Sequence, residues 1–403
     1  MTNTLLMPAR RVPVRNTCEV LVVGAGPAGI GAAVAAARAG ARVTLVEEGG
    51  KLGGMWTLGL VSPFFDTLGK SGLNEEIRTA LAERNAFGGL WNIAFDPVEM
   101  ELLLDRLVLG AGIDVLLYTR AVGPIVEDGA VKGVWIENKS GAAAILADWV
   151  VDCTGDAELA VAAGCGFDSG APGDGGLQPM TLMFRISGVR ADYPKDDSSL
   201  WYRRLAEVVG KERAVEAVPF ARPAIIPLPG GYGDALIQWT HVYHVDGSVA
   251  EQRSQATFEA RRQVSAAMEL LKSIRDVLGD VHVSALPSVI GVRETRRIHG
   301  LATVTDEDVL ESRRHPDDVC IVNFNVDIHN TSRNEGKTKA QTLVKHQGFG
   351  IPFGALVPKG VDRLFVAGRP ISGSFMAHAA YRVTGNCLAM GEAAGSAAAA
   401  KLS

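Results

Sequence analysis

Short apolar runs alternate with glycine-rich turns near the start of the chain. Residues 19–23 (EVLVV) have the length and composition of a buried strand, and the alanine-rich residues 30–39 predict a closely packed helix. Gly40 ends that helix, and residues 41–46 (ARVTLV) predict a second strand. The pattern therefore predicts a strand–helix–strand unit.

The turn between the first strand and this helix has the sequence GAGPAG. Gly24 permits a tight turn, Gly26 lets the backbone approach a pyrophosphate, and Gly29 allows close packing of helix on strand. A pyrophosphate at this position would meet the free N–H groups of the helix N-terminus. Glu47 follows the second strand and can accept hydrogen bonds from a ribose. Together these features predict a dinucleotide-binding Rossmann unit.

Alternating apolar and polar positions predict further strands at residues 113–119, 130–137 and 144–151. Turn residues separate the last two, so we interpret the group as a small β-meander inserted before the next Rossmann strand. Ahead of it, residues 96–99 (DPVE) combine an N-cap, a first-turn proline and a capping-box acid, which predicts the start of a helix.

A stretch rich in Gly, Asp, Ser and Pro at residues 166–176 predicts a linker and a domain boundary. The C-terminal third returns to a Rossmann-like pattern, with a strand and turn at residues 363–369 and an alanine-rich helix at residues 388–401. We therefore predict an α/β protein with a discontinuous Rossmann-like domain, an inserted β-meander and a second, α+β substrate domain. The predicted boundaries are 1–165 and 291–403 for the nucleotide-binding domain, and 166–290 for the substrate domain.

The composition excludes several classes of protein. The 403 residues are 47% hydrophobic and 21% charged, with a formal net charge of −5, so the chain lacks the positive field expected of a nucleic-acid-binding protein. The five cysteines are widely spaced without a Cys-x-x-Cys pair, which argues against a disulfide framework, a structural metal site and a dithiol redox centre. No apolar run reaches the length of a signal peptide or membrane span, so we expect a soluble, cytoplasmic protein.

Four separated segments carry a more specific likeness: residues 23–29 with Glu47, 52–55 (LGGM), 150–156 (VVDCTGD) and 364–395. With these segments, the chain resembles the FAD-dependent oxidoreductases of the glutathione-reductase-like flavoprotein superfamily. More narrowly, it resembles the family often called simply FAD-dependent oxidoreductase. The likeness covers most of the chain and is loosest in the middle domain. It implies FAD as the cofactor.

The resemblance also implies a set of FAD contacts. The glycine-rich turn would hold the pyrophosphate, Glu47 the adenosine ribose, and Val122 the adenine through its backbone. Thr154 and Gly155 would close over the nucleotide, and the last helix would point its N-terminus at the flavin, where it stabilises the negative charge of the reduced ring. The full implied set is Gly24, Gly26, Pro27, Ala28, Gly29, Glu47, Glu48, Gly53, Gly54, Met55, Val122, Thr154, Gly155, Gly368, Arg369, Asn386, Cys387 and Leu388.

The chain departs from the family pattern where substrate contacts are expected. The family often has Tyr-x-Ile-Pro-Tyr-Arg before its C-terminal strand, whereas this chain has Phe349, Phe353 and Gly354 at the Tyr, Tyr and Arg positions. Where the family often has a histidine after the Ala-Gly-Arg turn, this chain has Phe375. The substrate is therefore less predictable than the cofactor.

Three residues are candidates for catalysis, since a flavin enzyme needs a base and groups that orient the substrate. His329 follows an alternating strand whose end can present it to a cleft, and His378 lies close to the flavin-facing helix. A structural role is the alternative for each histidine. Arg382 precedes the same helix and is a candidate for contact with substrate or cofactor.

Two other polar groups favour structural roles. His241 and His244 lie three apart in a predicted strand and point to opposite faces, so they do not form a metal pair. The segment RETRRIH at residues 293–299 has the charge of an anion site and resembles an arginine-rich segment of the family. An ion-paired edge that joins two domains is the favoured interpretation.

We predict an FAD-dependent oxidoreductase, either an oxidase or a dehydrogenase, that takes a hydride from a small organic substrate beside a hydroxyl or amine. The middle of the chain lacks a second Gly-x-Gly-x-x-Gly unit, which argues against an NAD(P)H domain. Oxygen, a quinone or a partner protein could reoxidise the flavin. The alternatives are a flavin-dependent reductase, an electron-transfer flavoprotein subunit and, more weakly, a nicotinamide-binding protein. The alanine-rich surfaces would permit a homo-oligomer without requiring one.

Overall fold

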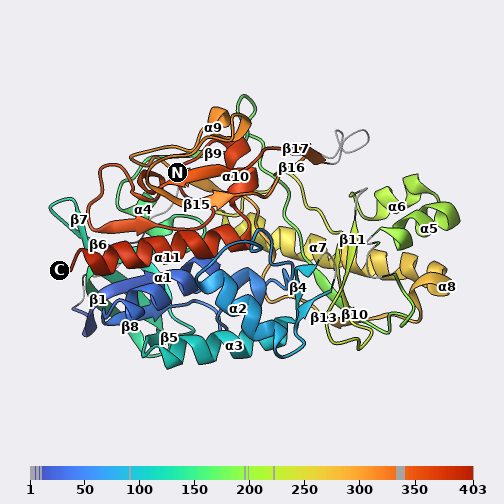
Figure 1. Ribbon diagram of the computed structural model, residues 1–403, viewed down its shortest axis with the longest axis horizontal. Helices are drawn as coiled ribbons and strands as arrows, with labels where there is room; N and C mark the ends of the chain where they lie inside the picture. The colour runs from blue at the N-terminus through green and yellow to red at the C-terminus, as the bar shows by residue number, and fades with distance from the viewer. Residues whose placement is uncertain are drawn as a thin grey trace.

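The computed structural model describes residues 11–402 except 90–91, 195–196, 198, 221–222 and 333–340, together with residues 5 and 9. In this part of the chain the main sheet has seven strands, in the order β5-β2-β1-β8-β7-β6 with β19 also paired to β8 (Figure 1). Strands β5, β2, β1, β8 and β19 are parallel, while β7 and β6 are antiparallel, so the sheet is mixed. Its strands are β1 (Val14–Val23), β2 (Val43–Val46), β5 (Asp114–Leu116), β6 (Arg120–Glu127), β7 (Ala130–Asn138), β8 (Gly141–Asp152) and β19 (Leu364–Val366).

The register of the parallel strands brings their carboxyl ends to one edge of the sheet. Val23 at the end of β1 pairs with Val46 of β2 on one side and with Asp152 of β8 on the other. Asp152 also pairs with Val366 of β19. The loops that leave these strands therefore emerge together, which is where open α/β sheets bind their ligands.

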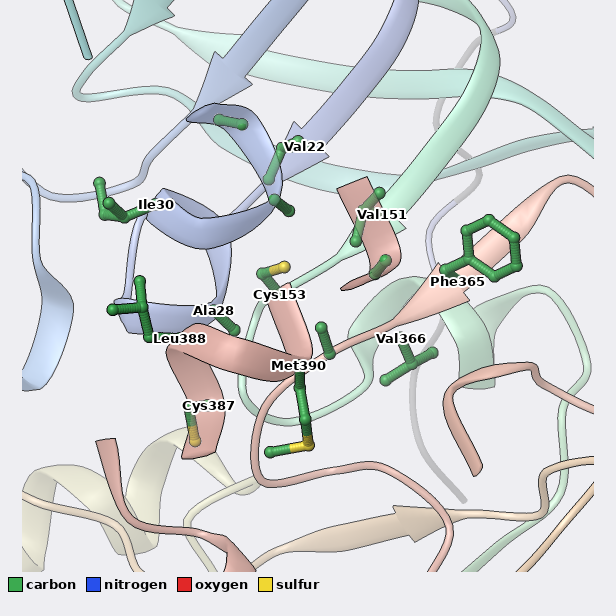
Figure 2. Packing of buried hydrophobic residues seen from close by; sticks show 14 of the residues in the cluster. Val22, Ala28, Ile30, Val151, Cys153, Phe365, Val366, Cys387, Leu388 and Met390 are labelled. Carbon is green, nitrogen blue, oxygen red and sulfur yellow. The ribbon is translucent and has the colours of Figure 1, made fainter. Parts of the chain in front are cut away.

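Helices α1 (Pro27–Arg38) and α11 (Thr384–Ala400) pack backbone to backbone beside this sheet. A Cβ atom at Gly391 would lie 2.0 Å from the carbonyl oxygen of Ala28, so only glycine fits there. Figure 2 shows Ala28 next to Leu388 where the two helices meet, below the side chain of Cys153 in this view. The small residues of both helices thus allow segments that are far apart in the sequence to form one layer.

The meander differs from the prediction at its first strand. Residues 113–119 contribute β5, which is a parallel edge strand beside β2, and the meander is formed by β6, β7 and β8. Strand β6 was not predicted from the sequence, because Gly123 and Pro124 interrupt its alternation of apolar and polar residues. The register shifts between Ala121 and Gly123, which accommodates this interruption as an irregularity in the strand.

A second sheet, entirely antiparallel, has the order β11-β12-β10-β13 and lies at the opposite end of the molecule (Figure 1). The helical stretch at residues 200–217 is broken at Gly210, whose φ of 87° ends α5 before α6 begins. These elements are β10 (Phe184–Ser187), α5 (Leu200–Val209), α6 (Lys211–Ala217), β11 (Ala224–Pro227), β12 (Ala235–Gln238), α7 (Ala250–Leu271), α8 (Arg275–Leu278) and β13 (His282–Ala285).

The remaining elements connect these two regions or cover the main sheet. The last helix begins at Thr384, four residues earlier than predicted, so its N-terminus reaches further toward the strand ends. The connecting elements are η1 (Gly54–Trp56), α2 (Leu73–Ala82), β3 (Phe87–Gly88), β4 (Ala94–Phe95), α3 (Pro97–Gly110), α4 (Glu158–Ala162), β9 (Phe167–Ser169), η3 (Lys272–Ile274), β14 (Arg296–Ile298), α9 (Asp306–Leu310), β15 (Asp318–Val322), β16 (Val326–His329), β17 (Gln341–Val344), β18 (Phe349–Pro352), η5 (Phe353–Leu356) and α10 (Phe375–Tyr381).

Separate hydrophobic cores support the two sheets. One core contains buried residues between positions 18 and 165 and again between 298 and 398, and another contains residues between 180 and 292. All five cysteines are buried and free. In the described residues, the helices fall short of the length and apolar character needed to cross a membrane.

Candidate active site

A cavity of about 640 Å³ opens where the loops leave the carboxyl ends of β1, β2, β8 and β19. Its volume lies within the range typical of cofactor pockets. Many of the residues predicted to bind a dinucleotide line this cavity. They are Gly24, Gly26, Pro27, Ala28, Glu47, Glu48, Gly54, Met55, Thr154, Gly155, Gly368, Arg369 and Cys387.

The N-terminus of α1 lines this cavity without a side-chain cap. Its N-cap residue is Gly26, which has no side chain to bond the first-turn N–H groups, and Pro27 begins the helix. A Cβ atom built on Gly26 meets nothing within 4 Å, so the space beside it is open. The free N–H groups and the helix dipole make this end of α1 suited to an anion such as a pyrophosphate.

Glu47 fastens the glycine-rich turn to the loop after β2. One carboxylate oxygen accepts a hydrogen bond from the N–H of Ala25, and the other accepts one from the N–H of Gly49, both at 2.7 Å. Burial raises the pKa of Glu47, although these two hydrogen bonds act in the opposite direction. A carboxylate has lone pairs for additional donors, so Glu47 can still accept ribose hydroxyls.

Asp152 fixes the loop that carries Thr154 and Gly155. Its Oδ1 accepts hydrogen bonds from the N–H and the hydroxyl of Thr154, and its Oδ2 accepts from the N–H groups of Leu159 and Ala160 in α4. Asp152 is fully buried, and this burial raises its pKa against the effect of the four hydrogen bonds. The strand end, the loop and α4 are therefore held together by one side chain.

An ion pair between Asp156 and Arg369 lies at the cavity wall. Asp156 accepts hydrogen bonds from Arg369 and from the hydroxyl of Thr295, and Arg369 also donates to the carbonyl of Val292. Burial by itself would raise the pKa of Asp156, but the charge of Arg369 and these hydrogen bonds lower it below its usual value. The pair ties the loops after β8 and β19 to the segment that returns from the second sheet.

The other predicted residues lie outside the lining of this cavity. Gly29 packs against the turn, where a Cβ atom would lie 1.8 Å from the carbonyl oxygen of Gly24. Gly53 donates its N–H to the carbonyl of Ala25, and Val122 is 53% exposed. The remaining three, Asn386, Leu388 and His378, are buried beneath the surface.

One wall of the cavity was not predicted from the sequence, and it comes from the part of the chain that carries the second sheet. Ala250, Arg253, Ser254 and Thr257 of α7 line it, as do residues 288–290. Arg120 and Ala121 line it as well, next to Val122. The one signal in the sequence is a helical spacing, which places positions 250, 253, 254 and 257 on one face of a helix. The same spacing fits ordinary packing equally well, so it does not identify a binding site.

A smaller cavity, of about 160 Å³, adjoins the first. Both cavities are lined by Met55, Arg369, Arg382 and Thr384, which come from the second glycine cluster, the turn after β19 and the start of α11. Its other lining residues combine apolar and charged side chains. They are Val61, Pro63, Phe65, Thr181, Met183, Gln238, Gly291, Val292, Arg293, Phe324, Asp327, His329 and Val383.

His329 is joined to a second buried histidine. Its Nδ1 lies 2.9 Å from Nε2 of His241, and Nδ1 of His241 lies 3.2 Å from the carbonyl oxygen of Trp239. The neutral pair has two N–H groups for three contacts, because the carbonyl of Trp239 and the carboxylate of Asp327 both only accept. With the shorter contact, to Trp239, satisfied, His241 carries its proton on Nδ1 and its Nε2 accepts from Nδ1–H of His329. This series of hydrogen bonds leaves the Nε2 atom of His329 with its lone pair. The histidine that sequence analysis treated as structural therefore sets the tautomer of a catalytic candidate.

Charged groups surround His329. Its Nε2 lies 3.4 Å from a carboxylate oxygen of Asp327, which lies 3.6 Å from Nη2 of Arg382. Burial and the charge of Arg293 lower the pKa of His329 to about 4, although Asp327 acts in the opposite direction. His329 is therefore neutral at pH 7, and Asp327 is placed to stabilise the imidazolium once a proton arrives.

The guanidinium group of Arg382 has a hydrogen-bond partner at one nitrogen and none at another. Its Nη2 donates to the carbonyl of Asp327 at 2.9 Å, while its Nε is buried without a hydrogen-bond partner among the described residues. The hydroxyl of Thr384 is buried in the same condition. Most buried polar groups in proteins have a hydrogen-bond partner, so buried donors without one indicate a functional role or a bound water or ion. Both side chains line the junction of the two cavities.

A family model described as FAD dependent oxidoreductase matches residues 19–403. The chain belongs to this family. It is an FAD-dependent oxidoreductase enzyme, as the sequence predicted. The protein combines a mixed central sheet of the Rossmann-like type with additional antiparallel sheets.

Individual relatives and solved structures are more distant. Digeranylgeranylglycerophospholipid reductase of Methanoculleus marisnigri is 32% identical over 174 residues, which are 37% of this chain and 42% of that protein. The chain thus matches less than half the length of this relative. A geranylgeranyl bacteriochlorophyll reductase-like protein of Thermoplasma acidophilum is 18% identical with a TM-score of 0.51, over 96% of this chain and 77% of that one. A triple mutant of the flavin-dependent brominase Bmp2 is 10% identical with a TM-score of 0.54, over 96% and 80%. These neighbours share the fold, and they do not specifically support the glutathione-reductase-like superfamily.

The residues that line the larger cavity fit FAD. The uncapped N-terminus of α1 matches a pyrophosphate, and the lone pairs of Glu47 match a ribose. At the junction, the partnerless donors of Thr384 and Arg382 match the polar edge of a flavin. The larger cavity thus offers suitable partners for each polar part of the cofactor.

Proposed function

We propose that this flavoenzyme oxidises a small organic substrate at a C–H bond beside a hydroxyl or an amine. The observation that carries the proposal is the junction of the two cavities at Met55, Arg369, Arg382 and Thr384. FAD in the larger cavity would supply a hydride acceptor, and the smaller cavity would hold the substrate beside it. In this proposal residues 1–165 and 291–403 form the FAD-binding domain, and residues 166–290 form the substrate domain.

His329 would accept the proton that leaves the substrate hydroxyl or amine. Three features support this role: it lines the smaller cavity, His241 keeps its Nε2 lone pair free of a proton, and Asp327 lies 3.4 Å from that nitrogen. Arg382 would hold Asp327 in position and contact the cofactor edge. We assign His378 no part in proton transfer, because it is buried outside the lining of either cavity.

The relatives support a second candidate, in which the flavin delivers electrons to a carbon–carbon double bond. The matched relative of Methanoculleus marisnigri is named digeranylgeranylglycerophospholipid reductase. The size of the smaller cavity favours oxidation of a compact substrate, because about 160 Å³ is close to the ~150 Å³ of an apolar cavity that binds one benzene. A lipid chain would need far more space.

The test is anaerobic reduction of the purified holoenzyme, followed by its visible absorption. Under the proposal, one class among small alcohols, hydroxy acids and amines bleaches the flavin bands, and admitting oxygen or a quinone restores them. If none of these compounds bleaches the flavin, while dithionite-reduced enzyme is reoxidised by an alkene, the reductase function replaces the proposal. Reoxidation by neither an alkene nor a small acceptor, but by a partner protein, would instead indicate an electron-transfer subunit.

A further inference from the structure

The smaller cavity contains more positive than negative charge. Three arginines line it, Arg293, Arg369 and Arg382, while Asp327 is the carboxylate among its lining residues. Arg369 is neutralised by Asp156, and Arg382 lies beside Asp327. His329 is neutral at pH 7, so the charge of Arg293 is left without an equivalent anion in the cavity.

Among the described residues, Arg293 donates its hydrogen bonds to neutral groups. Its hydrogen bonds run from Nη1 to the carbonyl of Pro179 and to the hydroxyl of Thr181, both neutral acceptors. Among the described residues, no carboxylate forms an ion pair with it. Burial and the repulsion of Arg382 lower the pKa of Arg293 to about 9, although the charge of Asp327 acts in the opposite direction, and Arg293 is still charged at neutral pH. A half-buried, charged guanidinium of this kind is stabilised strongly by an anion.

The rest of the cavity limits what that anion can be. Phe65, Phe324, Met183, Val61 and Pro63 form an apolar part of the wall. The volume of about 160 Å³ admits a compact molecule. The planar fork of an arginine matches the two oxygens of a carboxylate, and Nε and Nη2 of Arg293 remain for such a pair.

We propose that the substrate is a small carboxylic acid with a hydroxyl or amine on the adjacent carbon, and that Arg293 binds its carboxylate. The inference rests on the proposed function, because it assigns the smaller cavity to the substrate. It makes Arg293 the residue that selects acids over neutral alcohols and amines. The other residues with polar side chains that line this cavity are Thr181, Gln238, Asp327, His329, Arg369, Arg382 and Thr384.

Binding of such an acid would also affect the base. The charge of Arg293 lowers the pKa of His329, while Asp327 raises it, Arg382 lowers it and His241 contacts it from the far side. A carboxylate on Arg293 offsets that charge, so His329 becomes more basic when the substrate is in place. The enzyme thereby gains a stronger base only in the complex, where proton removal is needed.

The test measures binding without turnover, by calorimetric titration of the holoenzyme with propionate and with propionamide. The two probes have nearly the same shape, and only propionate carries a charge. We expect propionate to bind at least ten-fold more tightly, and Arg293→Gln to abolish this preference while the flavin spectrum stays unchanged. Arg293→Lys should retain part of it. Arg190→Gln is the matched control, since Arg190 is exposed, paired with Asp192 and outside the lining of both cavities.

Equal binding of the two probes by the parent enzyme would overturn the inference, and this comparison needs no variant to fold. Unchanged propionate affinity in Arg293→Gln would overturn it as well. The proposed function fails separately: if propionate binds through Arg293 but no hydroxy or amino acid bleaches the flavin, the anion site stands and oxidation does not. If neutral alcohols bleach the flavin and acids do not, oxidation stands and the assignment of Arg293 is wrong.

Discussion

Glu47 gives the most direct test of the proposal that the larger cavity holds FAD. Its carboxylate makes two hydrogen bonds of 2.7 Å, to the N–H groups of Ala25 and Gly49, and so fixes the turn that presents Gly26. A hydrogen bond to a charged group contributes about 1.5–3 kcal/mol. Because Gly49 lines an open cavity, water can replace part of its bond in Glu47→Ala, whereas Ala25 is buried and loses its partner. We therefore expect a net loss of about 1.5–3 kcal/mol in FAD binding, or about ten- to a hundred-fold in affinity.

The assay is a titration of apoprotein with FAD, followed by quenching of flavin fluorescence, and a parallel titration with ADP and with FMN. Since the loss concerns the adenosine half, Glu47→Ala should weaken FAD and ADP by similar factors and leave FMN unchanged. Glu19→Ala is the matched control, because Glu19 also accepts a backbone N–H bond at 2.7 Å, from Arg42, but lies outside the cavity lining. If Glu47→Ala bound FAD and ADP as tightly as the parent, the placement of the adenosine ribose at Glu47 would be refuted.

Three further predictions concern catalysis, acid stability and packing. His329→Gln should keep the flavin spectrum but slow anaerobic bleaching by about 10²–10⁴-fold in stopped flow, and an unchanged rate would exclude it as the base. Asp156 has a lowered pKa, so its stabilisation is present above the unfolded pKa of about 3.9 and is lost as pH falls through the folded value. Asp156→Asn, which leaves Arg369 unpaired, should lower the melting temperature at pH 7 and flatten its decline below about pH 4; a parallel decline would contradict this sign. Gly391→Ala should lower the free energy of unfolding by about 1–3 kcal/mol or more, because its Cβ would lie 2.0 Å from a carbonyl oxygen. Gly110→Ala is the control, since the space around Gly110 is open, and it should raise the free energy of unfolding by up to about 1 kcal/mol. Equal melting temperatures of the two variants would refute the packing argument.

The sequence by itself determined the cofactor half of this protein. The first strand, the GAGPAG turn, the helix and the second strand with its final glutamate are contiguous, so local propensity and spacing define the unit. The structure has this unit as β1, α1 and β2, with Gly26 at the helix N-cap and Glu47 bonded to the turn. A nucleotide site of this kind depends mainly on backbone N–H groups, whose positions follow from a short segment of chain.

Only the tertiary structure determined the smaller cavity and its polar groups, because these residues come from separate segments of the chain. The strand formed by residues 120–127 was missed, since Gly123 and Pro124 hide an alternation that pairing with β7 restores. His241 and His329 are 88 positions apart, yet they share a hydrogen bond that fixes a tautomer. Arg293 belongs to a cluster that was expected to form an ion-paired edge between two domains, and only the packing shows that Arg297 pairs with Glu294 while Arg293 lines a cavity. Charge balance and proton position at a buried site depend on all neighbours in space, and sequence spacing carries no record of them.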